Sequence, residues 1–570
     1  MKRITYLAIG LCLTLASCND YLNINVDPDS PTNTTATVAA RLPAVQHAVA
    51  HTYGTAAHFT ALIEQHITLT NRGNDRYGGL AQWDASGSNP RTASTYPYQI
   101  FFISAGGNFN DLYEKAENEG AYHYMGAVKF FRAAGFMAMT DIYGEIPYTY
   151  ALGETLNPAF DDGKTIFEGC LKELDEAVEL FRRTQEPGAT PLADGDSWLD
   201  GNADRWIKMC YGFKARWLNN LSKKSNLYNP DAVLAALDNA AKSNAESAVV
   251  RHSDEDENMK DLWGDPTKTS SAYIWLVNWS RIYYVTQWYA DLLTDFDGKG
   301  VVDPRAFRLI PLVQTGSEKT WTLSDGADMR TDIRLNSKFV EAAYSVETGE
   351  WTGSDGKLYV NLRTKGVINP DFAETAADGT YVNSGTFYAR PDAPTYLMCY
   401  PELCFIRAEA LLRKGDKTGA FAAYQDGIRA HFDLMNEKLQ TYNDPNNLSK
   451  TPMNREEIER YLNAATGTDA DITLGKIIMQ KYIALGFSHQ NWNDMRRLDY
   501  DPQVYRGWTP PYEYLNGSSS KASIPDGSAF RRFRQCVHEF NYNNDNVGAS
   551  HPAALQDNIY SCPVWWDTAE

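Results

Sequence analysis

The residues in this sequence with the clearest potential for ligand chemistry are aromatic. The densest group lies between Trp263 and Leu293, where Trp275 and Trp279 are four positions apart and would share one face of a helix. An aromatic ring offers a flat apolar surface to the C–H face of a sugar, and burying about 100 Å² of ring contributes about 2.5 kcal/mol. Trp275, Trp279 and Tyr283 are therefore predicted ligand contacts. Core packing between helices is the alternative for each ring.

A second group of candidate residues lies in the segment NRGNDRYGGLAQWDASGSNPR (71–91). Trp83 is an aromatic residue on a predicted loop, and the glycines around it permit unusual backbone turns. Arg72 and Asn89 supply hydrogen-bonding groups suited to sugar hydroxyls. Trp83, Arg72 and Asn89 complete the predicted ligand set.

The patterns that would indicate a metal site are incomplete. His47 and His51 are four positions apart and His58 lies two turns further on, but no HExxH arrangement accompanies them. The segment DFDGKGVVDPRA resembles an EF-hand loop, but Lys299 fills its fifth position and Ala306 its twelfth, where a bidentate glutamate is required. We therefore predict structural histidines, a simple turn, and neither a metal nor a cofactor.

No motif for catalysis is present in a convincing setting. We find no GxSxG, phosphate-binding loop or dinucleotide fingerprint of that kind. Among 72 acidic residues, some pair will resemble the two carboxylates of a glycosidase by chance. The sequence therefore predicts a binding protein rather than an enzyme.

The N-terminus has the form of a bacterial lipoprotein signal. Two basic residues precede an apolar run over 4–15, which is too short to cross roughly 30 Å of hydrocarbon. Small residues then lead directly into Cys18. We expect cleavage before Cys18 and lipidation of its thiol, with a signal peptide at 1–17 and a polar tether at 18–37. An ordinary secretory signal with a chance cysteine is the alternative.

The composition narrows the range of partners. A net charge of −19 repels phosphate backbones, so nucleic acid is not an expected partner. Six cysteines follow Cys18, too few for a disulfide framework in a chain of this length, and their oxidation state stays open. No later run approaches 18 uncharged apolar residues, so lipid is the only membrane attachment that we expect. An exported, acidic chain with 12% aromatic residues is typical of carbohydrate-binding proteins.

These candidate residues need a scaffold, and the sequence predicts a helical one. MGAVKFFRAAGFMAMTDIYG (125–144) is apolar almost all round, as in a helix buried among others. IFEGCLKELDEAVELF (166–181) has apolar residues at steps of three and four. From Ala408, small or apolar residues follow at offsets of 3, 12, 16 and 19, which is the spacing of a tetratricopeptide repeat. We predict about four stacked helix pairs.

Two regions depart from this helical pattern. Between about 300 and 400, short alternating runs broken by Ser-Asp-Gly predict small hairpins and irregular loops, which we expect to form the ligand face. After Asp499 the chain is rich in Pro, Gly, Asn and aromatic residues and is expected to form loops over the surface. No clear linker divides 38–570, so we predict a single domain.

Three stretches together resemble the SusD/RagB family of outer-membrane nutrient-binding lipoproteins. They are FFRAAGFMAMTDIYGEIPY (130–148), YPELCFIRAEALLRKGD (400–416) and IIMQKYIALGFSHQNWNDMRRLDYD (477–501). The resemblance implies an all-α, tetratricopeptide-like scaffold. It also implies that Trp492, Arg496 and Arg497 hold helices together rather than bind ligand.

The resemblance further implies a function and a partner. Such a protein captures oligosaccharides, or peptides, at the cell surface and passes them uncleaved to a SusC-like TonB-dependent transporter, over which it acts as a lid. A purely structural subunit of an uptake complex is one alternative. An all-α glycoside hydrolase or lyase is another, although the tetratricopeptide spacing and the irregular region argue against it.

Overall fold

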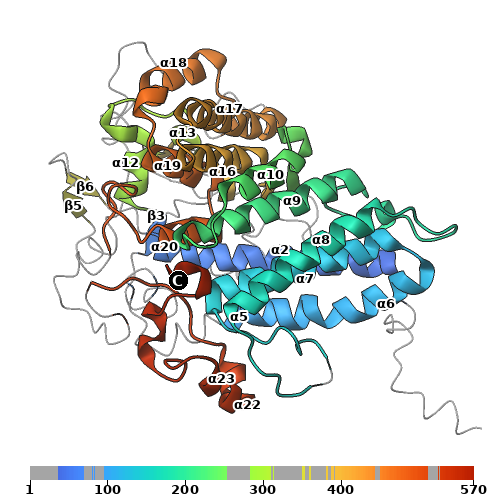
Figure 1. The fold of residues 1–570 in the computed structure, drawn as a ribbon. Helices are drawn as coiled ribbons and strands as arrows, with labels where there is room; N and C mark the ends of the chain where they lie inside the picture. The colour runs from blue at the N-terminus through green and yellow to red at the C-terminus, as the bar shows by residue number, and fades with distance from the viewer. Residues whose placement is uncertain are drawn as a thin grey trace, which may run out of the picture.

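The computed structural model describes most of the chain. The described residues are 36–69, 80, 83, 95–153, 155–252, 283–309, 312–313, 350–352, 358–360, 381–382, 387–389, 392–442, 450–510, 524 and 527–569. The architecture is mostly helical, with a few short strand pairs (Figure 1).

The N-terminal half consists of helices that lie side by side (Figure 1). In chain order they are α2 (Val38–Ile63), α5 (Thr95–Gln99), α6 (Phe109–Glu119), α7 (Tyr122–Tyr143), α8 (Gly163–Arg182), α9 (Ala203–Asn220) and α10 (Pro230–Asn239). A π-helical turn, η2 (Ile100–Ala105), and a short 3-10 turn, η3 (Gly106–Asn108), connect α5 to α6. Several of these helices begin at a side-chain cap; for example, Asp162 accepts hydrogen bonds from the first backbone amides of α8.

The C-terminal half adds a second group of helices. These are α12 (Gln287–Thr294), α13 (Ala306–Leu309), α16 (Tyr400–Arg413), α17 (Lys417–Tyr442), α18 (Arg455–Ala465), α19 (Leu474–Leu485), α20 (His489–Arg497), α22 (Val537–Tyr542) and α23 (Asn544–Ser550). The short helices η10 (Asp469–Asp471) and η12 (Trp565–Asp567) occur in the connections.

The strands form short antiparallel pairs. They are β1 (Ile67–Leu69) with β3 (Tyr283–Val285), β2 (Ala248–Val250) with β8 (Thr395–Met398), β4 (Leu312–Val313) with β7 (Tyr381–Val382), and β5 (Glu350–Thr352) with β6 (Leu358–Val360). Two of these pairs, β4–β7 and β5–β6, lie between residues 300 and 400, where the alternating sequence predicted small hairpins.

The helices pack as pairs of neighbours along the chain, which confirms the predicted scaffold. α7 packs on α8, α9 on α10 and α16 on α17, while α19 packs against α16 and α17. In Figure 1 these pairs follow one another from the lower to the upper part of the molecule. Each helix buries an apolar stripe against the next, so a continuous core forms only when the pairs stack.

The α16–α17 pair contains the predicted tetratricopeptide positions. Ala408, Ala420 and Tyr424 are completely buried between the two helices. Gly427 lies against the ring of Phe405, and a Cβ atom at this glycine would lie 2.9 Å from the ring. Small residues at these positions therefore allow the two helices to approach closely.

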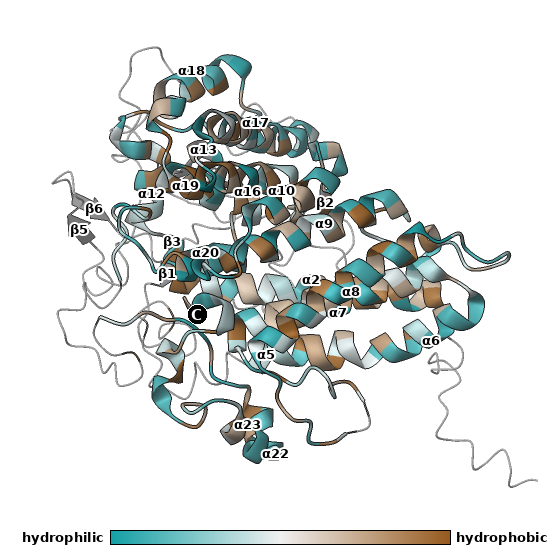
Figure 2. Ribbon diagram, in the orientation of Figure 1, coloured by the Kyte–Doolittle hydropathy of each residue, from teal (hydrophilic) through white to brown (hydrophobic). Residues whose placement is uncertain are grey.

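α7 is buried almost all round, as its sequence predicts. Two of its polar residues meet α8: Lys129 pairs with Glu176 at 2.7 Å and Arg132 with Glu173 at 2.8 Å. Thr140 is buried instead, and its hydroxyl donates to the carbonyl of Gly144 where the helix ends. In Figure 2 the brown, hydrophobic segments lie along inner helices such as α7, α16 and α19, while α18 at the edge is largely teal.

A buried ion network joins α20 to the helix pairs. Arg497 is fully buried and donates to both carboxylate oxygens of Glu409 at 2.6 and 2.7 Å and to Asp494 at 2.9 Å. Arg496 lies over the ring of Trp492 at 3.7 Å and donates to the carbonyl of Asp141. The prediction that Trp492, Arg496 and Arg497 hold helices together is confirmed.

The C-terminal segment returns to the first helices of the scaffold. The indole N–H of Trp566 donates to Asp141 of α7 at 2.8 Å, and Arg496 lies over the same ring. Asp567 is buried and pairs with Arg531 at 2.8 Å. Trp566 and Asp567 are therefore part of the core.

Candidate ligand-binding site

The candidate site begins at the β1–β3 pair, where two of the predicted ligand segments meet. Leu69 at the end of β1 pairs with Tyr283 at the start of β3. Arg72 follows Leu69 by three positions, and Trp279 precedes Tyr283 by four. Arg72 and Trp279 are some 200 positions apart in sequence. Each is nevertheless within four positions of a residue of the Leu69–Tyr283 pair.

Most of the predicted ligand residues are not described. Arg72, Asn89, Trp275 and Trp279 lie outside the described residues, as does Cys18, and their roles remain predictions. Tyr283 is the first residue of β3. Trp83 is the one predicted contact whose side chain can be placed.

Trp83 is buried rather than exposed. Its exposed fraction is 1%, and its indole N–H donates to the carbonyl of Ile63 at 2.8 Å. Its ring packs against Tyr500 and Trp508 at centroid distances of 5.5 and 5.7 Å. In this conformation Trp83 is part of the packing beneath the candidate site. Its ring would have to become exposed to contact a ligand.

Trp83, Trp508 and Tyr500 together form a cluster of rings that we call the aromatic platform. Trp508 and Tyr500 stack on each other at 5.2 Å, and the Trp508 indole donates to the carbonyl of Glu64. The Tyr500 hydroxyl donates to the carbonyl of Phe530 at 2.6 Å. Both residues were expected on surface loops, and that expectation is wrong for them, because their rings fill the space beside the end of α2.

The turn from α2 into β1 is hydrogen-bonded to the residue after Trp508 and to the residue after β3. Gln65 has a φ of 61°, and its side-chain amide donates to the carbonyl of Thr509 at 2.6 Å. The Thr286 hydroxyl, just after β3, donates to the carbonyl of Gln65 at 2.6 Å. The ends of β1 and β3 and the residue after Trp508 are therefore all joined to one turn.

Two buried titratable residues flank this turn. His66 lies on Tyr289 at a ring-centroid distance of 3.9 Å, and burial lowers the pKa of His66 to about 3. Burial also raises the pKa of Glu64 well above its usual value, although the nearby Asn491 side chain acts in the opposite direction. Burial thus disfavours the charged form of both side chains at the base of the site.

The histidines and acidic residues considered as metal ligands have other surroundings. His58 is buried and stacks on Phe59 at 5.3 Å, and burial lowers the pKa of His51 to about 4, with the neighbouring His47 acting in the same direction. Asp297 pairs with Arg506 at 2.8 Å. Within the described ranges, no three His, Cys, Asp or Glu side chains gather as a metal site would require.

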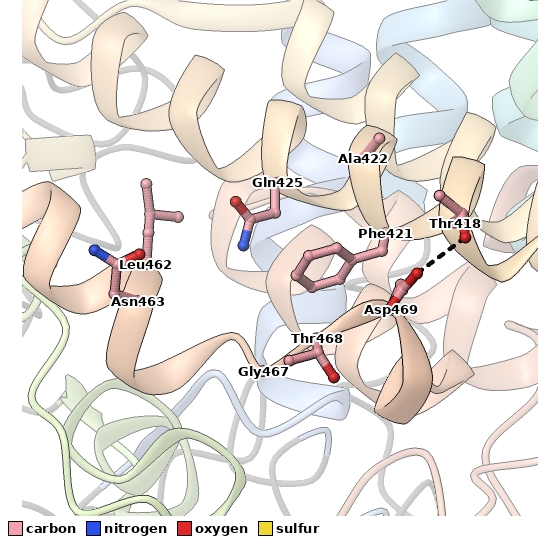
Figure 3. Close-up of a pocket in the computed structure, with 9 residues that line it drawn as sticks. All are labelled: Thr418, Phe421, Ala422, Gln425, Leu462, Asn463, Gly467, Thr468 and Asp469. Atoms are coloured by element: carbon pink, nitrogen blue, oxygen red, sulfur yellow. Dashed lines mark hydrogen bonds between the residues drawn. The ribbon is translucent and has the colours of Figure 1, made fainter.

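A hollow of about 440 Å³ lies elsewhere, on the scaffold (Figure 3). Its lining comes from α17, the end of α18 and the connection into η10: Thr418, Phe421, Ala422, Gln425, Leu462, Asn463, Gly467, Thr468 and Asp469. A hydrogen bond of 2.9 Å from Thr418 to Asp469 joins the two sides. Phe421 is the one aromatic ring in the lining, so the hollow offers less stacking surface than the platform beside β1.

A family model described as starch-binding and associating with the outer membrane matches residues 30–310 and 338–516. The chain belongs to the SusD-like family. The predicted resemblance is thus confirmed over most of the chain, and the family description names binding and an outer-membrane association. No curated protein matches the chain.

Solved structures of SusD-like proteins have the same fold. A SusD/RagB family protein from Bacteroides thetaiotaomicron aligns with a TM-score of 0.64 at 18% identity, covering 93% of this chain and 99% of the other. A SusD homolog from Bacteroides fragilis gives 0.62 at 21%, covering 93% and 98%. A structure titled as a chitin-binding protein gives 0.64 at 18%, covering 93% and 100%. At these identities the likeness concerns the fold.

In this SusD-like chain, the described part of the site contains residues that sequence reasoning missed. Trp508 belongs to the platform, and His66 and Tyr289 stack beside the turn; none of the three was singled out. One usable signal was Gly507, which has a φ of 76° and turns the chain so that the next residue packs inward. Across the described residues, no helix is both long and apolar enough to span a membrane.

Proposed function

We propose that this protein captures oligosaccharides at the cell surface and delivers them, without cleavage, to a SusC-like TonB-dependent transporter. It would be held to the outer membrane by lipid on Cys18 and act as a lid over the barrel. The SusD-like family match across most of the chain carries this proposal. The joining of β1, β3 and the residue after Trp508 to one turn beside the aromatic platform supports a loop-built ligand site there.

The chemistry of the platform fits a neutral, ring-shaped ligand. At its base, burial disfavours the charged forms of both His66 and Glu64. The predicted contacts Arg72, Trp275 and Trp279 follow β1 or precede β3 in the sequence, which supports a ligand site here. Stacking by two or three rings, less the cost of association, corresponds to dissociation constants of roughly micromolar to millimolar.

Calorimetric titration of the chain from Asn19 against a panel of oligosaccharides tests the proposal. The panel includes malto-oligosaccharides, because of the family description, and chito-oligosaccharides, because of the chitin-binding neighbour. Trp275→Ala and Trp279→Ala should each weaken binding about tenfold, from a loss of roughly 1.4 kcal/mol or more. Tyr542→Ala is the matched control, since this ring is 76% exposed and lies on α22.

Three other outcomes have distinct meanings. New reducing ends in the titrated mixtures would contradict a non-catalytic protein and favour a hydrolase. Binding of peptides alone would change the ligand class but keep the lid function. Absence of binding to every sugar and peptide would favour a structural subunit of the uptake complex.

A further inference from the structure

Six large apolar side chains are exposed on one end of the molecule, and we call this group the apolar end. Its members, with their exposed fractions, are Ile103 (67%), Tyr150 (63%), Leu156 (94%), Val537 (41%), Tyr542 (76%) and Leu555 (50%). Among the described residues, Leu227 is the one other large apolar side chain exposed to this degree. The grouping therefore calls for an explanation beyond scattered surface hydrophobics.

Contacts between α22 and α5 bring the first members together. The amide of Val537 donates to the Thr95 hydroxyl at 3.3 Å, and the Tyr98 hydroxyl donates to Glu539 at 2.8 Å. Ile103 lies on η2, which continues directly from α5. α22 and α23 lie at the bottom of the view in Figures 1 and 2, and α5 lies above them.

The loop after α7 adds Tyr150 and Leu156 to the same end. Asn543 donates to the carbonyl of Pro158 at 2.9 Å, which attaches the loop to the start of α23. Asn110 of α6 donates to the carbonyl of Leu152 at 2.8 Å, which attaches it on its other side. The loop thus extends between α6 and α23 with its apolar side chains facing outward.

The described chain begins beside this end. Lys115 of α6 donates to the carbonyl of Ala36 at 3.1 Å, and the same helix holds the loop through Asn110. Ala36 lies eighteen positions after Cys18, a distance that at full extension spans about 60 Å. A lipid on Cys18 would thus leave this end within reach of the bilayer.

The charges around the apolar end indicate what kind of surface it fits. Glu539, Asp545 and Asp557 lie beside the apolar residues, and Arg534 pairs with Asp557 at 3.4 Å. This surplus of negative charge disfavours anionic lipid, so contact must come from apolar insertion. Tyrosine and leucine side chains are suited to the boundary between headgroups and acyl chains.

We propose that the apolar end rests on the surface of a lipid bilayer beside the anchor. This inference rests on the outer-membrane location in the proposed function. Contact at this end gives the anchored protein a second attachment point, which limits the orientations it adopts around its tether.

Vesicle flotation of the non-lipidated chain from Asn19 tests the inference. The chain should float with phosphatidylcholine–phosphatidylethanolamine vesicles, with little dependence on salt, and less when phosphatidylglycerol is added. The double variant Leu156→Asp, Tyr542→Asp should reduce the floated fraction roughly tenfold, because both side chains are exposed and would insert directly. Leu227→Asp, at an exposed leucine outside the apolar end, is the matched control and should float like the wild type.

Failure of the wild type to float, or equal flotation of the double variant, would overturn the inference. So would a dimer in light scattering that the double variant dissociates, since the apolar end would then be a contact between copies. Oligosaccharide titration of the same variants separates the two proposals. Glycan binding without flotation removes only the membrane contact, whereas flotation without glycan binding removes only the proposed ligand.

Discussion

At the scale of single residues, Glu64 is a carboxyl group placed where a charge is unfavourable. It caps the end of α2, is completely buried, and its carboxylate oxygens have no hydrogen-bond partner among the described residues. Burial raises its pKa well above the usual value. Burial therefore favours the uncharged carboxyl group at the base of the candidate site.

This raised pKa predicts the pH dependence of a substitution. A group whose folded pKa is raised favours folding fully below its unfolded pKa, near 4.5, and loses that contribution as the pH rises. Glu64→Gln should therefore raise the free energy of unfolding at pH 7.5 by on the order of 1–3 kcal/mol, with the difference vanishing below about pH 4.5. Urea denaturation at several pH values measures it.

Glu117→Gln, on the exposed side of α6, is the matched control and should show no such trend. A stability difference for Glu64→Gln that grows as the pH falls would contradict a buried, protonated carboxyl.

Single residues are also where the sequence was least informative. Trp83 looked accessible because its neighbours in sequence are polar and small. Its burial depends on Ile63, twenty positions earlier, and on Trp508, more than 400 positions later. Local sequence predicts a loop, but contacts over such distances decide which way a ring on that loop points.

At the scale of elements, the sequence was far more informative. Apolar spacing predicted α7, α8 and the α16–α17 pair, because each helix buries one stripe or is surrounded by others. The strand pair β1–β3 could not be predicted, since each strand is three residues long and its partner lies over 200 positions away. The platform depends on that pairing, so most of the candidate site could not be predicted from sequence.

Close approach of α16 and α17 predicts the effect of adding a single methyl group. In Gly427→Ala the new Cβ would lie 2.9 Å from the fully buried ring of Phe405. Overpacking should cost about 1–3 kcal/mol and exceed the gain in helix propensity of up to about 1 kcal/mol. Thermal denaturation should show a lower Tm, and adding Phe405→Leu should recover part of it.

Gly107→Ala is the control for this substitution, because nothing lies within 4 Å of the Cβ it would add. If both variants lowered the Tm equally, close helix packing would not be the cause.

At the scale of the whole molecule, the C-terminal segment packs between α7 and α20 through Trp566. Trp566→Ala removes a buried ring and leaves Asp141 without its indole partner, so it should lower the free energy of unfolding by about 3–5 kcal/mol. Trp565→Ala is the matched control, because this neighbouring ring is only half-buried, with Lys224 at 4.9 Å. It should lower the free energy of unfolding clearly less than Trp566→Ala does. Equal losses in denaturant unfolding would contradict this.

The bond between Trp566 and Asp141 spans 425 positions of the chain. This part of the core forms only when residues that are far apart along the chain have met, and contacts of such long range form slowly. The chain between the two residues has to close as one large loop before the contact can stabilise it. Folding should therefore be slower than in a helical protein of similar size whose contacts are mostly local.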